Sequence, residues 1–353
     1  MPGFEPYRAA VAQAAPEYLD LPRSIDKAVA LIETAAREGA RLVAFPELWL
    51  PGYPWWVWLA PPVWAAASGI AAEYGEHSLA VDSPSAERLA AAARRHRIFV
   101  SMGLSERLHG SLYIAQWLIG DDGRLLARRR KLKPGAAERL MFGEGDGSDL
   151  RVDATPIGRI GALCCAEHRS PLFKHALHVQ HEQIHVAAWP SFSIYQPFSP
   201  GQSAEVNLAI SRVYAAEGGC YVLAPSAPVT AAMRERVCDT PEKAALLALG
   251  GGHAMAFGPH GNALCEALAP DEEGLLYCDI DPAELAAAKR GYDGVGHSTR
   301  PDVVRLLVDR VERNERGDGN QRVVHGQRDA AVRAVQTEAQ AEVLAPATPQ
   351  SAA

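Results

Sequence analysis

Segments typical of β-strands and of α-helices alternate along most of this chain, and that order constrains its fold more than any other feature of the sequence. Residues 7–13 have the pattern of a strand, residues 21–37 that of a helix with one apolar face, and residues 41–45 that of a buried strand ended by Pro46. The patterns recur, with helices expected at 83–96, 171–180, 204–216 and 282–289, and strands at 98–103, 112–119, 125–132, 158–165, 184–189, 221–224, 253–257 and 275–280. The residues alone therefore predict a mixed α/β domain in which helices cover the sheets.

The length and composition suit one such domain followed by a tail. The chain has 353 residues, of which 48% are hydrophobic and 22% charged, as in ordinary globular proteins. We expect residues 1–315 to form a single domain. From about Arg316 onward the sequence turns to Gly, Gln, Arg and Ala and ends in a Pro- and Ala-rich stretch, so we expect residues 316–353 to be a weakly ordered C-terminal tail.

Charge and cysteine content exclude several classes of protein. The formal net charge of -7 provides no overall positive surface for nucleic acid or an anionic membrane. The six cysteines show no C-x-x-C spacing, which argues against a disulfide framework or a zinc ribbon. Residues 1–13 lack the basic start and apolar stretch of a secretory signal, so the expected location is the cytoplasm.

One stretch is unusually aromatic and carries no charge. The 25 residues between Glu47 and Glu73 contain no Asp, Glu, Lys or Arg, and five of the seven tryptophans of the chain lie in them (Trp49, Trp55, Trp56, Trp58 and Trp64). The length would suffice for a membrane helix, but four prolines interrupt the stretch and would leave backbone groups unpaired in lipid. We therefore expect a large apolar loop packed against the protein.

Three of the expected strands end in side chains that carry chemistry. Glu47 follows the strand at 41–45, Lys131 lies near the end of the strand at 125–132, and Cys165 ends the strand at 158–165. The carboxyl ends of strands are where α/β proteins place their sites. These three groups suit attack on the carbon of a nitrile or an amide, because a carboxylate can take the thiol proton and an ammonium can stabilise the developing charge.

The segments around these residues resemble the signatures of the nitrilase branch of the carbon-nitrogen hydrolase superfamily. The resemblance is carried by Phe45-Pro46-Glu47, Arg130-Lys131-Leu132-Lys133-Pro134 and Gly161-Ala162-Leu163-Cys164-Cys165-Ala166-Glu167-His168. Supporting stretches at 50–54, 142–148, 186–192 and 296–302 follow in the expected order, so the likeness covers about residues 5–310.

The resemblance implies a four-layer α-β-β-α sandwich and a nitrilase that converts a nitrile to the carboxylic acid and ammonia. It implies Glu47 as the general base, Cys165 as the nucleophile that forms a thioimidate and then a thioester, and Lys131 as the electrostatic stabiliser. A second glutamate of the family matches Glu138, which without the resemblance would be interpreted as a solvated helix residue. Neither a metal ion nor an organic cofactor is implied.

Two of these residues have a neighbour of similar chemistry. Cys164 precedes Cys165, but Cys165 occupies the nucleophile's place in the motif, and strand alternation points Cys164 to the opposite side. Lys133 follows Lys131 by two residues, but the family's lysine lies directly between Arg and Leu, which favours Lys131.

Five residues are candidates for contact with the substrate: Tyr53, Ala166, Trp189, Pro190 and Ser191. Many family members have an aromatic residue where this chain has Ala166, so we expect a wide pocket. The tryptophans begin two residues after Glu47 and could supply an aromatic wall to that pocket. These features favour an aromatic or arylacetonitrile-like nitrile. Gly135 and Ala136 replace the Thr-His pair that is usual in the family.

Three alternative functions are kept beside this one. The first is an amidase, or an amide-forming or cyanide-converting member of the same superfamily. The second is a zinc hydrolase using His181 and His185, which match H-E-x-x-H; that motif needs a helix, whereas a strand is expected here. His175, His178 and His181 are then expected to be partly exposed polar residues.

The third alternative is a non-catalytic assembly protein, motivated by the apolar content of residues 302–308. The family resemblance itself implies homodimers that build larger homo-oligomers or spiral filaments. The expected partners are otherwise a small nitrile and water, with no nucleic acid and no membrane.

Overall fold

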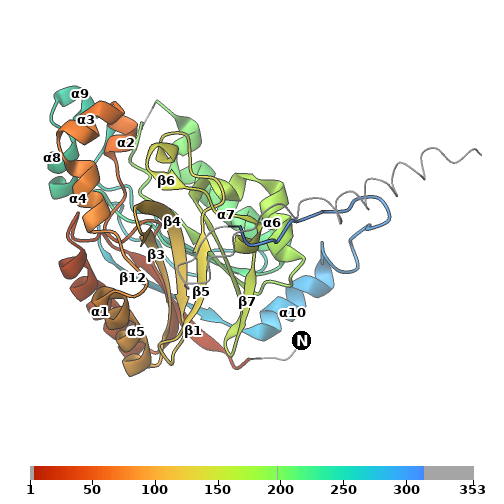
Figure 1. Cartoon of the computed structure of the whole chain (residues 1–353). Helices are drawn as coiled ribbons and strands as arrows, with labels where there is room; N and C mark the ends of the chain where they lie inside the picture. The colour runs from red at the N-terminus through yellow and green to blue at the C-terminus, as the bar shows by residue number, and fades with distance from the viewer. Residues whose placement is uncertain (1–3, 197, 314–353) are drawn as a thin grey trace, which may run out of the picture. The chain divides into compact units, whose positions relative to one another are not determined.

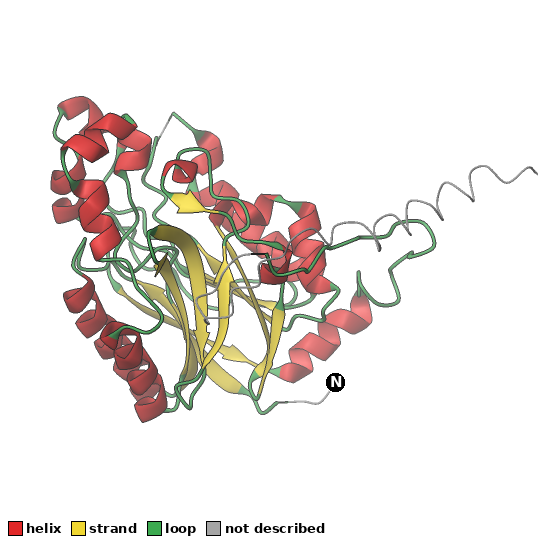
Figure 2. Ribbon diagram, viewed as in Figure 1, coloured by secondary structure: helices red, strands yellow, loops and turns green. Residues whose placement is uncertain are grey.

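The structure, a computed structural model, describes residues 4–196 and 198–313, and these residues form two β-sheets with helices on their outer faces (Figures 1 and 2). The tail expected at 316–353 lies outside the described residues, and the domain boundary at 315 stays a prediction. None of the helices in the described ranges combines the length and the hydropathy that a bilayer span requires.

The first sheet has the strand order β12-β1-β2-β3-β4-β5, with β6 paired to β4. Its strands are β1 (Tyr7–Gln13), β2 (Ala40–Ala44), β3 (Phe99–Leu108), β4 (Ser111–Ile119), β5 (Leu125–Arg130), β6 (Phe142–Gly143) and β12 (Gly274–Ile280). The pairs β1–β2 and β2–β3 are parallel, whereas β3–β4 and β4–β5 are antiparallel. The hairpin expected between residues 112 and 132 is thus confirmed.

The second sheet has the order β11-β10-β9-β8-β7. Its strands are β7 (Val152–Thr155), β8 (Gly158–Cys164), β9 (Ile184–Ala188), β10 (Tyr221–Ala224) and β11 (Met255–Phe257). The inner strands β8, β9 and β10 run parallel, while β7 and β11 are antiparallel edges. All three inner strands are almost wholly buried, as a sheet covered on both faces requires.

Helices cover the outer face of each sheet, and apolar side chains fill the space between the sheets. Helices α1 (Leu21–Arg37) and α5 (Pro84–His96) pack on the first sheet, and α6 (Pro171–His178) and α7 (Ala204–Gly218) pack on the second. A further core between the sheets joins residues of both, such as Val11 and Leu42 from the first with Ile160 and Val186 from the second. The α-β-β-α sandwich is therefore confirmed. Helix α10 (Pro282–Gly291) follows β12.

Local sequence signals explain where the long helices begin. Asp20 accepts a hydrogen bond from the Arg23 amide at the start of α1, and Ser83 accepts one from the Ala86 amide at the start of α5. A proline occupies the first turn of both helices, where no backbone donor is lost. The start of α5 could be predicted from its Ser83 cap, whereas α1 was predicted from its apolar face.

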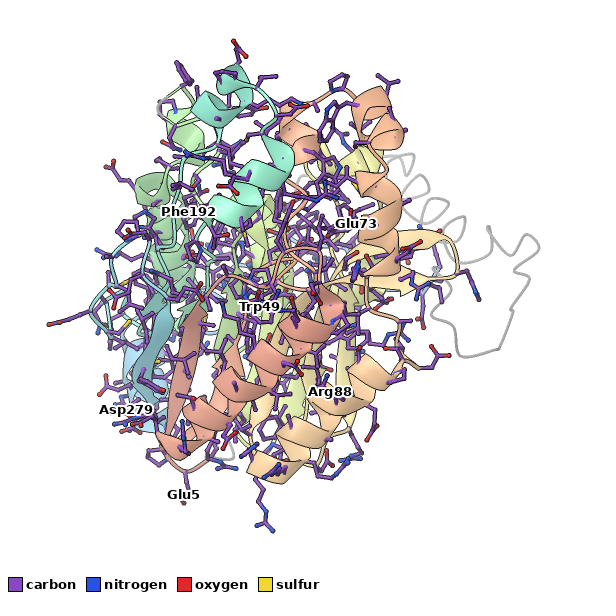
Figure 3. The ribbon with its side chains drawn as sticks, turned by 90° about the vertical axis from the view of Figure 1, so that its left-hand side faces the viewer. Glu5, Trp49, Glu73, Arg88, Phe192 and Asp279 are labelled. Carbon is purple, nitrogen blue, oxygen red and sulfur yellow. The ribbon has the colours of Figure 1, made fainter. Side chains whose placement is uncertain are left out.

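The aromatic segment folds into short helices instead of an open loop. It contains α2 (Trp56–Leu59), α3 (Pro62–Ala67) and α4 (Ile70–Glu76), and these lie beside α8 (Ala231–Val237) and α9 (Pro241–Leu246) in Figure 1. Figure 3 labels Trp49 and Glu73, which mark the two ends of the segment. Trp49 is buried in the core under α1 and α5, whereas Trp55 and Trp56 are buried in a separate core that includes residues of α8.

Candidate active site

The side chains of Glu47 and Lys131, together with Glu138, form a buried ionic group at the strand ends. Lys131 directly follows β5, and its Nζ donates to Glu47 Oε1 at 2.7 Å and to Glu138 Oε2 at 2.8 Å. The side chains of Glu47 and Lys131 are completely buried, and that of Glu138 is 2% exposed. Glu138 is thus not the solvated helix residue that its local sequence alone suggests. One ammonium here lies between two carboxylates.

Burial and mutual charge set the protonation of this group. Burial alone would lower the pKa of Lys131, but the carboxylates of Glu138 and Glu47 outweigh it and raise that pKa well above its usual value. For Glu138, burial is outweighed by Lys131 and the hydrogen bonds it accepts, and its pKa is lowered. For Glu47, burial prevails over Lys131, and the pKa is raised. Glu47 is therefore the carboxylate that can take up a proton.

Glu138 is held by more than the ammonium. The backbone amide of Gly135 donates to Glu138 Oε2 at 2.5 Å, and the hydroxyl of Tyr53 donates to Glu138 Oε1. Trp58 Nε1 in turn donates to the Tyr53 hydroxyl at 3.0 Å. The polar pair that Gly135 and Ala136 replace is therefore not needed to anchor this carboxylate, because a backbone donor at Gly135 does so.

Cys165 lies directly after β8, at the first residue of a 3₁₀ turn that spans Cys165–Arg169. Its φ of +45° is in the left-handed region, which a residue with a side chain adopts only under constraint. Cys165 as a whole residue is partly exposed although its thiol is buried, and the following Ala166 is exposed. Burial raises the pKa of the Cys165 thiol, as does the charge of Glu47, while Lys131 acts in the opposite direction. The structure thus brings the thiol, the carboxylate and the ammonium together.

The neighbouring residues of similar chemistry lie elsewhere. Cys164 is buried at the end of β8, where its Sγ is 3.5 Å from Gln116 Oε1 and 3.8 Å from an Arg129 nitrogen. Lys133 is exposed and forms an ion pair with Glu144. The geometry therefore agrees with the preference for Cys165 and Lys131.

Glu167 is a structural element of the site that the sequence reasoning missed. Its carboxylate forms a buried ion pair with Arg129 at 2.7 Å. It also accepts hydrogen bonds from the amides of Leu132 and Cys164, both at 2.8 Å. One carboxylate thus ties the residue after Lys131 to the residue before Cys165. Its place in the motif was visible, but its partners are 35 and 38 residues away in the chain.

The expected substrate-binding residues fall into two sets. Tyr53 reaches the ionic group, and Ala166 is exposed beside the thiol. Trp189 is buried with its ring stacked on His168, and its carbonyl accepts from the Glu47 amide at 3.2 Å. Pro190 is buried, and the Ser191 hydroxyl is bonded to the Gly250 carbonyl. Direct contact of these last three residues with a substrate stays a prediction.

The H-E-x-x-H motif does not form a two-histidine metal site. His181 is exposed in a turn, whereas His185 is buried within β9. His178 was expected to be partly exposed, but this was wrong, because the C-terminal turn of α6 packs it against Tyr214. Among the described residues, the group whose spacing could hold a metal ion is His178, Glu182 and Cys220, with ligand atoms within 4.8 Å of one another. Both oxygens of Glu182 are already hydrogen bonded, to His185 and Tyr214.

Comparison with known proteins places this chain in a family. The family model of the carbon-nitrogen hydrolases matches residues 8–290. A nitrilase of Pseudomonas syringae pv. syringae is 52% identical over 86% of this chain and 90% of its own length. An aliphatic nitrilase of Rhodococcus rhodochrous and an arylacetone-specific nitrilase of Alcaligenes faecalis are each 47% identical, over 85% and 86% of this chain and 82% and 84% of their own lengths.

Solved structures agree with this assignment at the level of the fold. The Caenorhabditis elegans NitFhit protein superimposes with a TM-score of 0.67 at 18% identity, over 87% of this chain and 68% of its own. The carbon-nitrogen hydrolase of Helicobacter pylori G27 gives 0.65 at 19% identity, over 85% and 97%. With two sheets between helix layers and relatives that match most of its length, this chain belongs to the carbon-nitrogen hydrolase family, in its nitrilase branch.

Proposed function

We propose that Cys165 is the nucleophile of this nitrilase, with Glu47 as general base, Lys131 as electrostatic stabiliser and Glu138 as the carboxylate that orients Lys131 and the attacking water. The observation that carries the proposal is the buried Lys131 ammonium, bonded to both carboxylates, whose charges act on the nearby Cys165 thiol. Such a group can move protons and stabilise negative charge within one small volume.

The chemistry uses two water molecules. The sulfur of Cys165 adds to the nitrile carbon while the nitrogen gains a proton, which gives a thioimidate. Water then adds to the same carbon, and the tetrahedral intermediate expels ammonia to leave a thioester. A second water hydrolyses the thioester to the carboxylic acid and returns the thiol. The amide of Ala166 and the ammonium of Lys131 are the donors that face the developing anion.

The pKa directions specify how the first step begins. Burial raises the pKa values of both the Cys165 thiol and Glu47. The resting site therefore holds a protonated thiol, and the active form has Glu47 ionised. The thiol proton moves to Glu47 as the sulfur attacks, so no free thiolate has to accumulate in a buried place.

Release of an amide is the alternative outcome of the same intermediate. If the tetrahedral carbon loses the thiol before ammonia, the product is the amide and not the acid. The high similarity to three nitrilases favours the acid. The acid-to-amide ratio after complete conversion of one nitrile decides between the two, and an excess of amide would favour the amide-forming alternative.

We propose an aromatic or arylacetonitrile-like substrate. The small, exposed Ala166 leaves room next to the thiol, and the aromatic segment approaches the site through Tyr53 and Trp58. One relative is named arylacetone-specific and another aliphatic, so similarity alone does not choose between the classes.

Ammonia release from phenylacetonitrile and mandelonitrile, compared with that from valeronitrile, tests this choice. We expect a higher kcat/KM for the aromatic pair. A higher value for valeronitrile would overturn the substrate proposal, and ammonia release by Cys165→Ala would overturn the function itself.

A larger assembly is proposed on different grounds. Residues 302–308 expose several apolar side chains, among them Val303, Val304 and Leu307 at 66%, 74% and 89%. Such a strip gains free energy when a second copy covers it. We propose a homodimer that builds larger homo-oligomers or a spiral filament in the cytoplasm. Sedimentation of the wild type and of Leu307→Ser measures it, and a monomeric wild type would contradict it.

A further inference from the structure

We propose that Glu182 is a positioning residue for the nucleophile, acting through His185 and His168 on the backbone carbonyl of Cys165. The inference rests on the role proposed above for Cys165, and it gives a function to part of the H-E-x-x-H motif. It assigns no contact with the substrate to Glu182.

A continuous line of hydrogen bonds joins these residues. Glu182 Oε1 lies 2.7 Å from His185 Nδ1, His185 Nε2 lies 3.0 Å from His168 Nε2, and His168 Nδ1 lies 2.8 Å from the Cys165 carbonyl oxygen. The side chains of Glu182, His185 and His168 are completely buried. The line starts just before β9, passes through that strand and ends at the turn after β8.

The donor and the acceptor of each hydrogen bond in this line can be assigned, starting from the Cys165 carbonyl. A carbonyl oxygen can only accept, so His168 Nδ1 must carry the proton that it donates to Cys165. His168 Nε2 is then an acceptor in the neutral ring, and His185 Nε2 must donate to it. This leaves His185 Nδ1 as an acceptor, so the proton between it and Glu182 comes from a protonated carboxyl group. All three side chains are neutral in this arrangement.

Burial favours the neutral arrangement. It lowers the pKa values of His168 and His185 well below normal and raises that of Glu182. The other titratable groups around Glu182 come from several elements, namely His178 on α6, Tyr214 on α7, Cys220 before β10, Lys289 on α10 and Arg129 on β5. His178, Lys289 and Arg129 act to lower the pKa of Glu182, as does the hydrogen bond from Tyr214, but burial outweighs them.

The surroundings are shaped to hold this line in place. The Tyr214 hydroxyl donates to Glu182 Oε2 at 2.5 Å, and its ring stacks on His185. The ring of Trp189 stacks on His168, which fixes the other imidazole plane. Gly161 on β8 faces Glu182, and a Cβ at that position would come within 2.0 Å of Glu182 Oε1. Only glycine leaves the carboxyl group room here.

The line ends at the backbone carbonyl of Cys165, where it can fix the conformation of the nucleophile's turn. Cys165 has a left-handed φ, so its peptide groups need an outside constraint to keep the thiol aimed at the ionic group. The bond from His168 supplies that constraint. If Glu182 loses its proton, His185 must donate to it instead, and His168 must then donate to His185. A bare nitrogen lone pair would face the Cys165 carbonyl, and the hold on the turn would be lost.

The test compares two substitutions of Glu182. Glu182→Gln keeps the direction, because the amide N–H can donate to His185 and the amide oxygen can accept from Tyr214, but it cannot ionise. Glu182→Ala removes the donor. For Glu182→Gln we expect kcat within about threefold of the wild type, and for Glu182→Ala a fall of about 10–100-fold with KM little changed.

The pH profile separates this role from a merely structural one. Glu182 must be protonated to hold the turn, and burial raises its pKa to about 7, so the ratio of the kcat of Glu182→Gln to that of the wild type should rise as the pH passes upward through that value. The same ratio for Tyr214→Phe should rise in this pH range, because the variant lacks a hydrogen bond that lowers the pKa of Glu182 in the wild type. Both variants keep the packing of the wild type, so the test stands even if Glu182→Ala fails to fold.

Clear results would overturn the proposal. A loss of kcat in Glu182→Gln as large as that expected for Glu182→Ala would show that the carboxylate charge is what matters. A ratio of Glu182→Gln to wild-type kcat that does not change with pH would show that Glu182 does not act on the site. Failure of the proposed function is recognised separately, because Cys165→Ala would then keep its turnover whatever the Glu182 variants do.

Discussion

Two buried groups of side chains flank the turn at Cys165, and one group is charged while the other is neutral. In front of the thiol, Lys131 is charged and lies between two carboxylates. Behind it, the line from Glu182 through two histidines is neutral. The difference is instructive in the two glutamates. Glu138, bonded to an ammonium, has a lowered pKa, whereas Glu182, bonded to a histidine and a tyrosine, has a raised one.

The comparison teaches that burial alone does not decide the charge of a carboxyl group. A buried carboxyl group keeps a lowered pKa where a cation and several further donors contact it, as at Glu138, and has a raised pKa where the donors are fewer, as at Glu47, or neutral, as at Glu182. The front of the site can therefore drive proton transfer and charge stabilisation. The back can serve only to hold geometry.

The largest effect is expected from removing the thiol at the boundary between the two sides. Cys165→Ala should lower kcat by about 10⁴-fold or more, because the covalent route is then closed. Ammonia release under substrate saturation measures it. Cys164→Ala is the matched control and should keep most of the activity, since the Cys164 thiol points to Gln116 and Arg129. Equal losses in the two variants would contradict the assignment.

A glutamate-to-glutamine substitution should cause a large loss of activity in the charged group but almost none in the neutral group. Glu47→Gln keeps an acceptor for Lys131 but removes the base, so we expect kcat/KM to fall by about 10²–10⁴-fold. Glu182→Gln is its counterpart behind the thiol and should be nearly silent near neutral pH. Initial rates of both purified variants, with circular dichroism to confirm folding, make the comparison. A Glu47→Gln enzyme of nearly full activity would remove the distinction between the two sides.

The rise of kcat/KM at acid pH should reflect the ionisation of Glu47. Glu47 must be ionised to act, and burial raises its pKa above the usual 4.5, so kcat/KM should rise with pH through a midpoint above that value. The measurement is kcat/KM between pH 4 and pH 10 in buffers of constant ionic strength. A midpoint at the ordinary glutamate value would mean that Glu47 is solvated or is not the base.

A smaller loss than that of Cys165→Ala or Glu47→Gln is expected when the support of the ionic group is removed. Tyr53→Phe removes the hydroxyl that donates to Glu138, and we expect a loss of about tenfold in kcat with an intact fold. Trp58→Phe removes only the donor behind that hydroxyl and should cost less. Steady-state kinetics of the two variants give the order. A larger loss for Trp58→Phe would place the tryptophan ring, and not the Tyr53 hydroxyl, at the substrate.

Much of the fold could be predicted because its signals are local. The strands at residues 7–13 and 221–224 and the helix at 21–37 have the expected bounds, since periodicity and capping act within a few residues. The short helices of the aromatic segment were not foreseen, because its prolines and glycine indicate a loop while its packing against α8 comes from far along the chain.

The residues of the site show the same difference between local signals and contacts with distant parts of the chain. Glu47, Lys131 and Cys165 could be named because each follows a strand and lies in a familiar motif. Glu138 depended wholly on the resemblance, since nothing in its local sequence indicates burial. Glu167 was missed because its partner Arg129 lies in the other sheet, and Glu182 because Tyr214 reaches it from α7, 32 residues further along the chain.

Glu167 has a mechanical consequence for the enzyme. Lys131 follows a strand of one sheet and Cys165 a strand of the other, and apolar packing fills the space between the two sheets. The carboxylate of Glu167 accepts hydrogen bonds from the backbone beside both residues, so it links the two strand ends directly. The spacing between the ammonium and the thiol, on which catalysis depends, is therefore fixed by a polar bridge between two backbones as well as by the core between the sheets.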